Sequence, residues 1–210
     1  MLIAGAKGFA KEVLEVLCQA DPQAIVAFYD DVSAQLPAQL YGKYPVLRTL
    51  EQAQQWLAQD NQFALGVGSP QIRRSLAEKL RSIGGMLTST CSPRANIGLF
   101  GNQLGTGCNI MTGAILTSDI TLGEGVLVNL NCTIGHDSVV GAYCELSPGV
   151  HLSGHVELGS NCVLGTGAVV LPGVKIGANS IIGAGSVVNK DVPPNVVAVG
   201  IPAKVIKQLA

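Results

Sequence analysis

The chain has 210 residues, a length that suits one large domain or two small ones, and its formal net charge of -1 gives nucleic acid no basic surface to bind. The mean hydropathy is high at +0.39, yet no run of about 18 apolar residues is present, so we expect no membrane partner. The first residues lack a basic leader followed by a long apolar stretch, which predicts a cytoplasmic protein.

Residues 1–86 alternate strand patterns with helical patterns. Strands are predicted at residues 2–4, 25–29 and 63–67, and helices at residues 13–17, near residues 50–57, and from Ser69-Pro70 to residue 80. The polar stretch that contains Pro37, Gly42 and Pro45 is expected to be a connection. Such alternation is typical of a small open parallel sheet, so we predict a Rossmann-like α/β domain over residues 1–86.

Two loops of this domain could contact a nucleotide. Gly5-Ala6-Lys7-Gly8 lies between a predicted strand and a predicted helix, where a helix N-terminus can bind phosphate. The segment lacks the full G-x-G-x-x-G spacing, so an ordinary tight turn stays open as an alternative. Asp30 and Asp31 end the second strand and could hydrogen-bond a ribose or a uracil, or simply form a turn.

From Leu87 onward the helical pattern gives way to a period of six residues. An aliphatic residue occupies every sixth position, at Leu104, Ile110, Leu116, Leu122, Val128, Ile134, Val140, Leu146, Leu152, Leu158, Leu164, Val170, Ile176, Ile182 and Val188. A period of this length indicates a repeat architecture in which each unit buries its apolar face against the next. We therefore predict a second domain over residues 87–210.

Four cysteines fall in the small-residue position of this repeat. They are Cys108, Cys132, Cys144 and Cys162, each four places after an aliphatic position. No C-x-x-C pair is present, so we interpret them as compact apolar side chains and predict no metal site.

If three hexads form one triangular turn, residues 18 apart lie above one another at the strand spacing of about 4.8 Å. His136 then shares a column with Ser118 and Gly154, and Asp137 lies below His155. An imidazole can accept a proton near neutral pH, and an adjacent carboxylate stabilises the imidazolium that results. An exposed histidine at a corner of the coil is also compatible with a purely solvated side chain.

The hexads, the segment Gly200-Ile201-Pro202-Ala203-Lys204 and the N-terminal α/β pattern together resemble a known family. They resemble the left-handed β-helix hexapeptide-repeat acyltransferases, in the bacterial branch of sugar O- and N-acetyltransferases with a small nucleotide-sugar-binding N-terminal domain. This branch includes UDP-4-amino-sugar acetyltransferases and sialic acid O-acetyltransferases. The resemblance covers nearly the whole chain and implies a left-handed parallel β-helix, acetyl-CoA as co-substrate, and a homotrimer with active sites between subunits.

The resemblance also implies roles for particular residues. The general base corresponds to His136 and its acidic partner to Asp137. The acetyl-CoA contacts correspond to Glu145, Thr166 and Ala184, and the nucleotide-sugar contacts to Lys7, Gly8, Phe9, Asp30, Asp31 and Gly68. The chain departs from the family at two places, because the family usually has a histidine at Glu145 and reads Gly-His-Gly where this chain has Gly8-Phe9-Ala10.

The function that we expect is acetyl-CoA-dependent N-acetylation of a nucleotide-linked 4-amino sugar, for bacterial surface or protein glycan biosynthesis. Three alternatives stay open on the sequence. They are a sugar or sialic acid O-acetyltransferase, a zinc enzyme similar to carbonic anhydrase that uses His136, His151 and His155, and a sugar-nucleotide-binding protein without catalysis.

Overall fold

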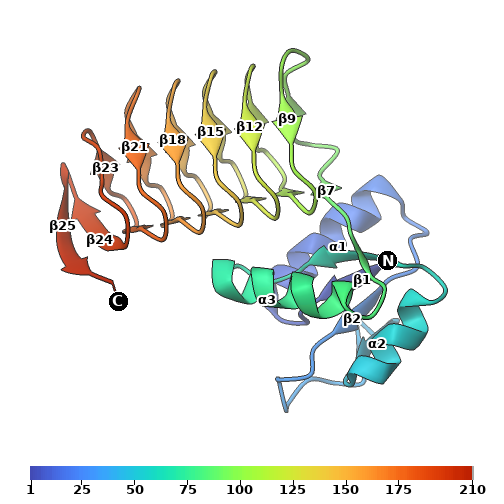
Figure 1. Cartoon of the computed structure of the whole chain (residues 1–210). Coiled ribbons are helices and arrows are strands. Elements are labelled where there is room, and N and C mark those ends of the chain that lie inside the picture. The colour runs from blue at the N-terminus through green and yellow to red at the C-terminus, as the bar shows by residue number, and fades with distance from the viewer. Residues whose placement is uncertain (210) are drawn as a thin grey trace.

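The computed structural model describes residues 1–209, and Ala210, the last residue of the predicted second domain, lies outside that range. Six short strands near the N-terminus form one sheet in the order β3-β4-β2-β1-β5-β6 (Figure 1). They are β1 (Leu2–Ala4), β2 (Ala27–Tyr29), β3 (Gln39–Leu40), β4 (Tyr44–Leu47), β5 (Gln62–Leu65) and β6 (Met86–Leu87). All neighbouring pairs are parallel except β3 and β4.

Three helices pack against this sheet. They are α1 (Gly8–Ala20), α2 (Leu50–Leu57) and α3 (Pro70–Arg81). Thr49 and Gln52 form a capping box at the start of α2, and Pro70 occupies the first turn of α3, where a missing N–H costs no helical hydrogen bond. The predicted strands and helices of this part are therefore confirmed, with shifts of at most two residues at their ends except in α1, which begins five residues before and ends three residues after the predicted segment 13–17.

The expected connection at Pro37–Pro45 instead contains the hairpin β3–β4. Tyr41 and Gly42 both have positive φ, at 52° and 63°, and the N–H of Lys43 donates to the carbonyl of Leu40. This is the geometry of a tight hairpin turn, in which asparagine or glycine usually takes the first position. Because tyrosine occupies that position here, the hairpin left no recognisable signal in the sequence.

The rest of the chain coils into three sheets, with an edge of the coil between each pair (Figure 1). Their strands are parallel, except that the last strand of sheet 1 runs antiparallel to its neighbour. Sheet 1 holds β7 (Thr90–Cys91), β10 (Asn109–Ile110), β13 (Leu127–Val128), β16 (Glu145–Leu146), β19 (Val163–Leu164), β22 (Ile181–Ile182), β24 (Val196–Gly200) and β25 (Ala203–Gln208). Sheet 2 holds β8 (Asn96–Ile97), β11 (Ile115–Leu116), β14 (Thr133–Ile134), β17 (His151–Leu152), β20 (Val169–Val170) and β23 (Val187–Val188). Sheet 3 holds β9 (Gln103–Leu104), β12 (Thr121–Leu122), β15 (Val139–Val140), β18 (Glu157–Leu158) and β21 (Lys175–Ile176). Partners from β10 to β23 are 18 residues apart, as predicted.

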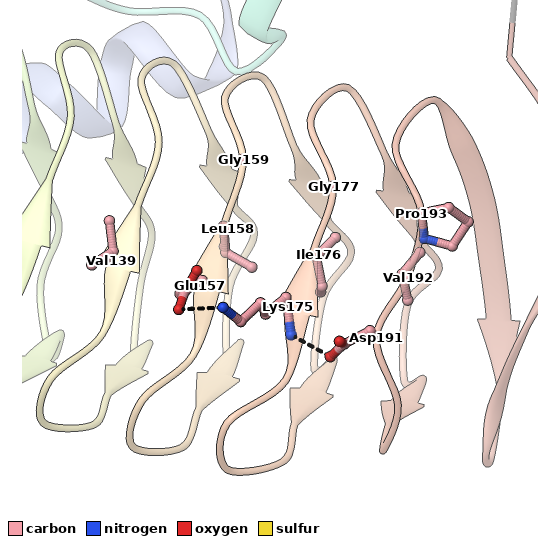
Figure 2. A pocket seen from close by; sticks show the side chains of 10 residues that line it. All are labelled: Val139, Glu157, Leu158, Gly159, Lys175, Ile176, Gly177, Asp191, Val192 and Pro193. Carbon is pink, nitrogen blue, oxygen red and sulfur yellow. Dashed lines mark hydrogen bonds and ion pairs between the residues drawn. The ribbon is translucent and has the colours of Figure 1, made fainter.

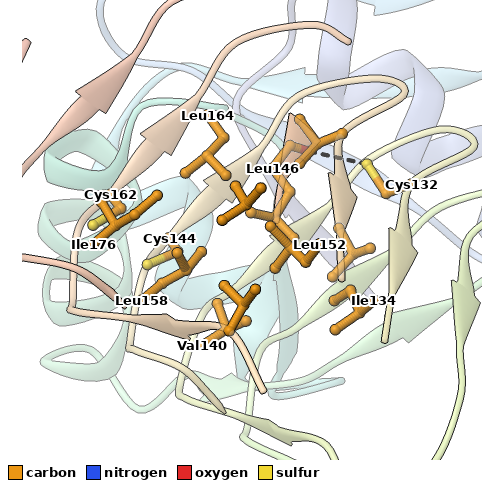
Figure 3. Close-up of a cluster of buried hydrophobic side chains, with 14 of the residues drawn as sticks. Cys132, Ile134, Val140, Cys144, Leu146, Leu152, Leu158, Cys162, Leu164 and Ile176 are labelled. Atoms are coloured by element: carbon orange, nitrogen blue, oxygen red, sulfur yellow. Dashed lines mark hydrogen bonds between the residues drawn. The ribbon is translucent and has the colours of Figure 1, made fainter. Parts of the chain in front are cut away.

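The aliphatic residues of the hexads fill the interior of the coil. Figure 3 shows them stacked in successive layers together with Cys132, Cys144 and Cys162. Every aliphatic position of the series is buried except Leu104, which lies in the first turn, where only one neighbouring turn covers it. The four cysteines that the repeat predicts to be compact apolar side chains are fully buried. Burial raises the pKa of the Cys108 and Cys132 thiols to about 11.

One buried arginine joins the α/β part to the coil. Arg73 of α3 donates hydrogen bonds to the carbonyls of Val67 and Gly125 and to Oδ1 of Asn109, at 2.8 to 2.9 Å. Beside it, Val16 of α1 packs against Met111 and Leu127 on the outer surface of sheet 1. No helix among residues 1–209 is long and apolar enough to cross a membrane.

Candidate active site

His136 and Asp137 lie on the edge between sheets 2 and 3, in the corner that joins β14 to β15. The corner bends sharply because Asp137 adopts a positive φ of 58°. This bend brings the Oδ2 atom of Asp137 to 2.7 Å from Nδ1 of His136. An ionised carboxylate only accepts hydrogen bonds, so in the neutral imidazole Nδ1 carries the proton and Nε2 has a free lone pair. The pair is thus arranged for His136 to accept a proton at Nε2.

His155, in the next turn of the coil, contacts this pair. The N–H of His155 donates to the carbonyl of His136 at 2.8 Å, which confirms the predicted columns. The Nε2 atom of His155 lies 3.7 Å from Oδ2 of Asp137, and its ring meets the His136 ring nearly at a right angle, with centroids 5.0 Å apart. The group that the structure assembles is therefore His136, Asp137 and His155, two histidines and an aspartate.

The third histidine is directed elsewhere. The Nδ1 atom of His151 lies 2.9 Å from Oγ1 of Thr133 on the outer surface of sheet 2. Potential metal-ligating atoms of His136, Asp137 and His155 do lie within 4.8 Å of one another. Within one chain, His151 therefore lies apart from the group formed by His136, Asp137 and His155.

The residues predicted to contact acetyl-CoA fall into two places. Thr166 and Ala184 are exposed and stacked on the edge between sheets 1 and 2, where the N–H of Gly185 donates to the carbonyl of Thr166. Glu145 instead begins β16 on sheet 1, where a Cβ atom on Gly68 would lie 2.9 Å from its Oε1. Burial raises the pKa of the Glu145 carboxyl, and the positive charge of Arg73 opposes that shift. Glu145 therefore lies beside a predicted nucleotide-sugar residue.

Lys7, Asp30 and Asp31 converge on one cavity of about 230 Å³ at the carboxyl ends of β1, β2 and β5. Ligands of open α/β sheets bind at this end of the strands. Its wall also includes Gly5, Ala6, Tyr29, Val32, Ser33, Val67, Ile72 and Leu76. Gly68 follows the wall residue Val67, and Gly8 begins α1.

Phe9, the last of the residues predicted to contact the nucleotide sugar, packs at the junction between the α/β part and the coil. It is half-buried against Val16, Met111 and Leu127. The sequence could not distinguish this position from a cavity-lining one, because the choice depends on how the α/β part docks on sheet 1.

Both aspartates of the cavity already have partners within the chain. Asp30 accepts hydrogen bonds from the N–H groups of Val32 and Ser33, so it forms the turn that was one alternative. Asp31 accepts a hydrogen bond from the hydroxyl of Tyr29 and pairs with Lys79. Burial opposes ionisation of Asp31, but the hydrogen bonds from Lys79 and Tyr29 prevail and lower its pKa.

A larger cavity of about 590 Å³ lies on sheet 3 and was not predicted (Figure 2). It begins at Val139, three residues after His136, and extends along the coil to Pro193. Lys175 lies between two carboxylates there: its Nζ pairs with Glu157 at 2.9 Å, and its N–H donates to Asp191 at 2.8 Å (Figure 2). Charged residues at the outward positions of the hexads were its only signal in the sequence.

An α/β cavity joined to a coil of hexads, with a His–Asp pair on one edge, defines the class of hexapeptide-repeat acyltransferases. Residues 1–80 match the family described as PglD N-terminal domain, and residues 155–190 match the family described as bacterial transferase hexapeptide (six repeats). The chain belongs to the PglD-like hexapeptide-repeat acyltransferases. The predicted fold class, an α/β domain followed by a left-handed parallel β-helix, is thereby confirmed.

Three relatives illustrate this membership. The chain is 32% identical to a mutant of perosamine N-acetyltransferase from Caulobacter crescentus in complex with CoA and GDP-perosamine, with a TM-score of 0.90 over 99% of this chain and 96% of that one. It is 28% identical to the acetyltransferase domain of PglB from Neisseria gonorrhoeae in complex with acetyl coenzyme A, with a TM-score of 0.89 and 98% of each chain covered. A segment of 104 residues is 38% identical to an acyl-[acyl-carrier-protein]–UDP-N-acetylglucosamine O-acyltransferase from Pseudomonas entomophila. That match spans 49% of this chain and 40% of the relative.

Proposed function

We propose that this protein transfers the acetyl group of acetyl-CoA to the amino group of a nucleotide-linked 4-amino sugar, in the cytoplasm, for bacterial surface or protein glycan biosynthesis. The observation that carries the proposal is the 2.7 Å contact between His136 Nδ1 and Asp137, which leaves Nε2 free on an exposed edge. The complexes of related proteins with CoA, acetyl coenzyme A and GDP-perosamine support the choice of co-substrate and acceptor.

The chemistry needs one proton acceptor and no covalent enzyme intermediate. The amine nitrogen attacks the thioester carbonyl carbon, and Nε2 of His136 takes the proton that the nitrogen loses. Asp137 stabilises the imidazolium through the Nδ1 hydrogen bond. The C–N bond forms, the C–S bond breaks, and the CoA thiolate leaves and receives the proton from His136.

Two parts of the site lie on different sides of one chain. The cavity with Lys7 belongs to the α/β part, which packs on sheet 1, whereas His136 lies on the edge between sheets 2 and 3. A second copy of the chain is needed to bring a base to a sugar bound in that cavity. This geometry supports the homotrimer as part of the proposal.

The surface of sheet 2 suits such an interface. Its outward side chains carry no Asp, Glu, Lys or Arg and are Asn96, Ile115, Thr133, His151, Val169 and Val187. Sheet 3 has Glu157 and Lys175 at the equivalent positions. Sheet 2 also lies between the His136 edge and the Thr166–Ala184 edge. Packing sheet 2 about a threefold axis therefore brings each His136 close to the acetyl-CoA edge of the next copy.

In this proposal, the two parts of the chain bind different substrates. Residues 1–86 bind the nucleotide sugar, with Lys7 and Gly8 near the phosphates, Asp30 and Asp31 shaping the loop after β2, and Gly68 near the sugar. Phe9 acts from the junction with the coil, where it packs against Val16, Met111 and Leu127. Residues 87–210 supply His136 and Asp137, with Glu145, Thr166 and Ala184 along the path of acetyl-CoA.

The test is acceptor-dependent release of free thiol from acetyl-CoA. A panel of UDP- and GDP-linked 4-amino sugars is compared with the same nucleotides carrying a sugar that has only hydroxyl groups. We expect release with an amino sugar and a loss of about 100-fold or more in His136→Ala. Asn179→Ala, at an exposed corner on the edge between sheets 3 and 1, serves as the control that keeps its activity. Release only with the hydroxyl sugars would identify an O-acetyltransferase, and none with any acceptor would refute the proposal.

A further inference from the structure

In the group of His136, Asp137 and His155, only His155 has no role in the reaction proposed above. It lies one turn beyond Asp137, and both residues have a φ of 58°. Because the two corners bend alike, the two side chains leave the edge in the same direction. The backbone hydrogen bond from His155 to the carbonyl of His136 holds the turns in this register.

The Oδ2 atom of Asp137 is shared between two imidazoles. It accepts the Nδ1–H of His136 at 2.7 Å and lies 3.7 Å from Nε2 of His155. The second distance is longer than a hydrogen bond but within the range of an ion pair. Such contacts are often long in enzymes without substrate and shorten in the complex. His155 is thus placed to restrain the carboxylate of Asp137 from the following turn of the coil, on the side opposite Asp119.

No other charged group competes for Asp137 from within its column. Asp119, one turn before, has the same kind of left-handed corner, with a φ of 56°. Its carboxylate is directed toward Gly101, where a Cβ atom would lie 1.9 Å from Oδ1. A carboxylate directed back toward Asp119 would meet a like charge, whereas His155 offers a hydrogen-bond donor.

We propose that His155 is a positioning residue that holds Asp137 in the orientation in which it accepts the Nδ1–H of His136. This contact selects the tautomer of His136 whose Nε2 is free to take the proton of the acceptor. The inference rests on the proposed function for its catalytic consequence, but not for its effect on the tautomer.

The kinetic test compares His155→Ala with His155→Gln, since the glutamine amide can place a donor near the position of Nε2. We expect His155→Ala to lower kcat about 10-fold with little change in either KM, and His155→Gln to recover most of that loss. In an Asp137→Asn background, adding His155→Ala should cost nothing more, because its effect passes through Asp137. Equal losses in both His155 variants, or losses that add to that of Asp137→Asn, would overturn the proposal.

A second measurement needs no substrate, so it keeps this inference separable from the proposed function. The sequence contains three histidines, and imidazole nitrogen resonances of ¹⁵N-labelled protein at mildly alkaline pH report the tautomer of each. Assignment uses His151→Ala. We expect the Nδ1–H form of His136 in the wild type and in His155→Gln, and a mixture of tautomers in His155→Ala. An unchanged His136 tautomer in His155→Ala would refute the proposal whichever acceptor the enzyme uses.

Discussion

Gly154 lies directly against the imidazole of His136, one turn of the coil away. A Cβ atom on Gly154 would be 2.7 Å from both Nε2 and Cε1 of that ring, closer than real Cβ contacts. The backbone of Gly154 lies outside the left-handed region. The imidazole, rather than the backbone, therefore accounts for the glycine at this position.

Gly154→Ala tests whether the position of the His136 imidazole matters for activity, without a change in the stability of the fold. The added methyl group displaces an exposed ring, which moves at low cost, so we expect an almost unchanged melting temperature. Displacing the base by about 1 Å should lower kcat/KM about 100-fold. Steady-state kinetics beside thermal unfolding by circular dichroism measure both quantities. Wild-type activity in Gly154→Ala would show that the ring position is unimportant.

The docking of the α/β part depends on Arg73. Its guanidinium is fully buried, and burial lowers its pKa to about 10, so it remains charged at neutral pH. Arg73→Met keeps the length of the side chain but leaves the carbonyls of Val67 and Gly125 and the Oδ1 atom of Asn109 without this donor. We expect a loss of about 3 kcal/mol or more in the free energy of unfolding in urea. Arg74→Met, which removes an exposed neighbour, should cost less than about 1 kcal/mol, and equal losses would contradict this role of Arg73.

The raised pKa of Glu145 predicts that the stability of the folded chain depends on pH. Burial raises its pKa above the ordinary value of 4.5, so the folded chain holds the proton more tightly than the unfolded chain. Its contribution to stability is fully present below pH 4.5 and is lost as the pH rises through the folded pKa. Glu145→Gln should therefore melt at a higher temperature than the wild type at neutral pH, with the difference vanishing in acid. Glu15→Gln, an exposed carboxyl on α1, is the control; a lower melting point of Glu145→Gln at neutral pH would mean that attraction to Arg73 dominates.

Much of the coil could be predicted because its geometry repeats. One hexad determines which side chains point inward, and an 18-residue turn then places every other hexad. The column that sets His136 beside Gly154, and Asp137 beside His155, followed from this counting alone. The repeat does not encode which way a corner side chain turns, so the contact between Asp137 and His155 required atomic coordinates.

The α/β part was less predictable where contacts depend on docking or on an unusual turn. Phe9 faces the coil because α1 packs on sheet 1, and no local pattern reports that packing. Tyr41 in a tight turn concealed the hairpin β3–β4. The cavity on sheet 3 is lined by the ion pair of Glu157 with Lys175, two residues that the column rule aligns but does not orient.

The group around His136 should also capture zinc. Imidazole nitrogen and carboxylate oxygen are preferred zinc ligands, and one such atom from each of His136, Asp137 and His155 lies within 4.8 Å of the others. A bound ion would occupy His136 and prevent it from accepting a proton. We expect added Zn²⁺ to inhibit thiol release reversibly, with recovery on addition of a chelator, whereas Mg²⁺, which prefers oxygen ligands, should not inhibit. Inhibition of equal strength in His155→Ala would place the zinc elsewhere.

The trimer proposed through sheet 2 makes a prediction with a closely matched control. Ile115 on sheet 2 and Val139 on sheet 3 are 43% and 45% exposed, and each is the outward residue of a two-residue strand. Burying a charge in an interface that has no opposite charge is costly, so Ile115→Asp should dissociate the trimer and abolish transfer, because no copy then presents His136 to a neighbour. Val139→Asp should remain a trimer. Light scattering coupled to size-exclusion chromatography gives the mass of each variant. A trimeric Ile115→Asp beside a dissociated Val139→Asp would instead make sheet 3, with its charged groove, the face that joins the copies.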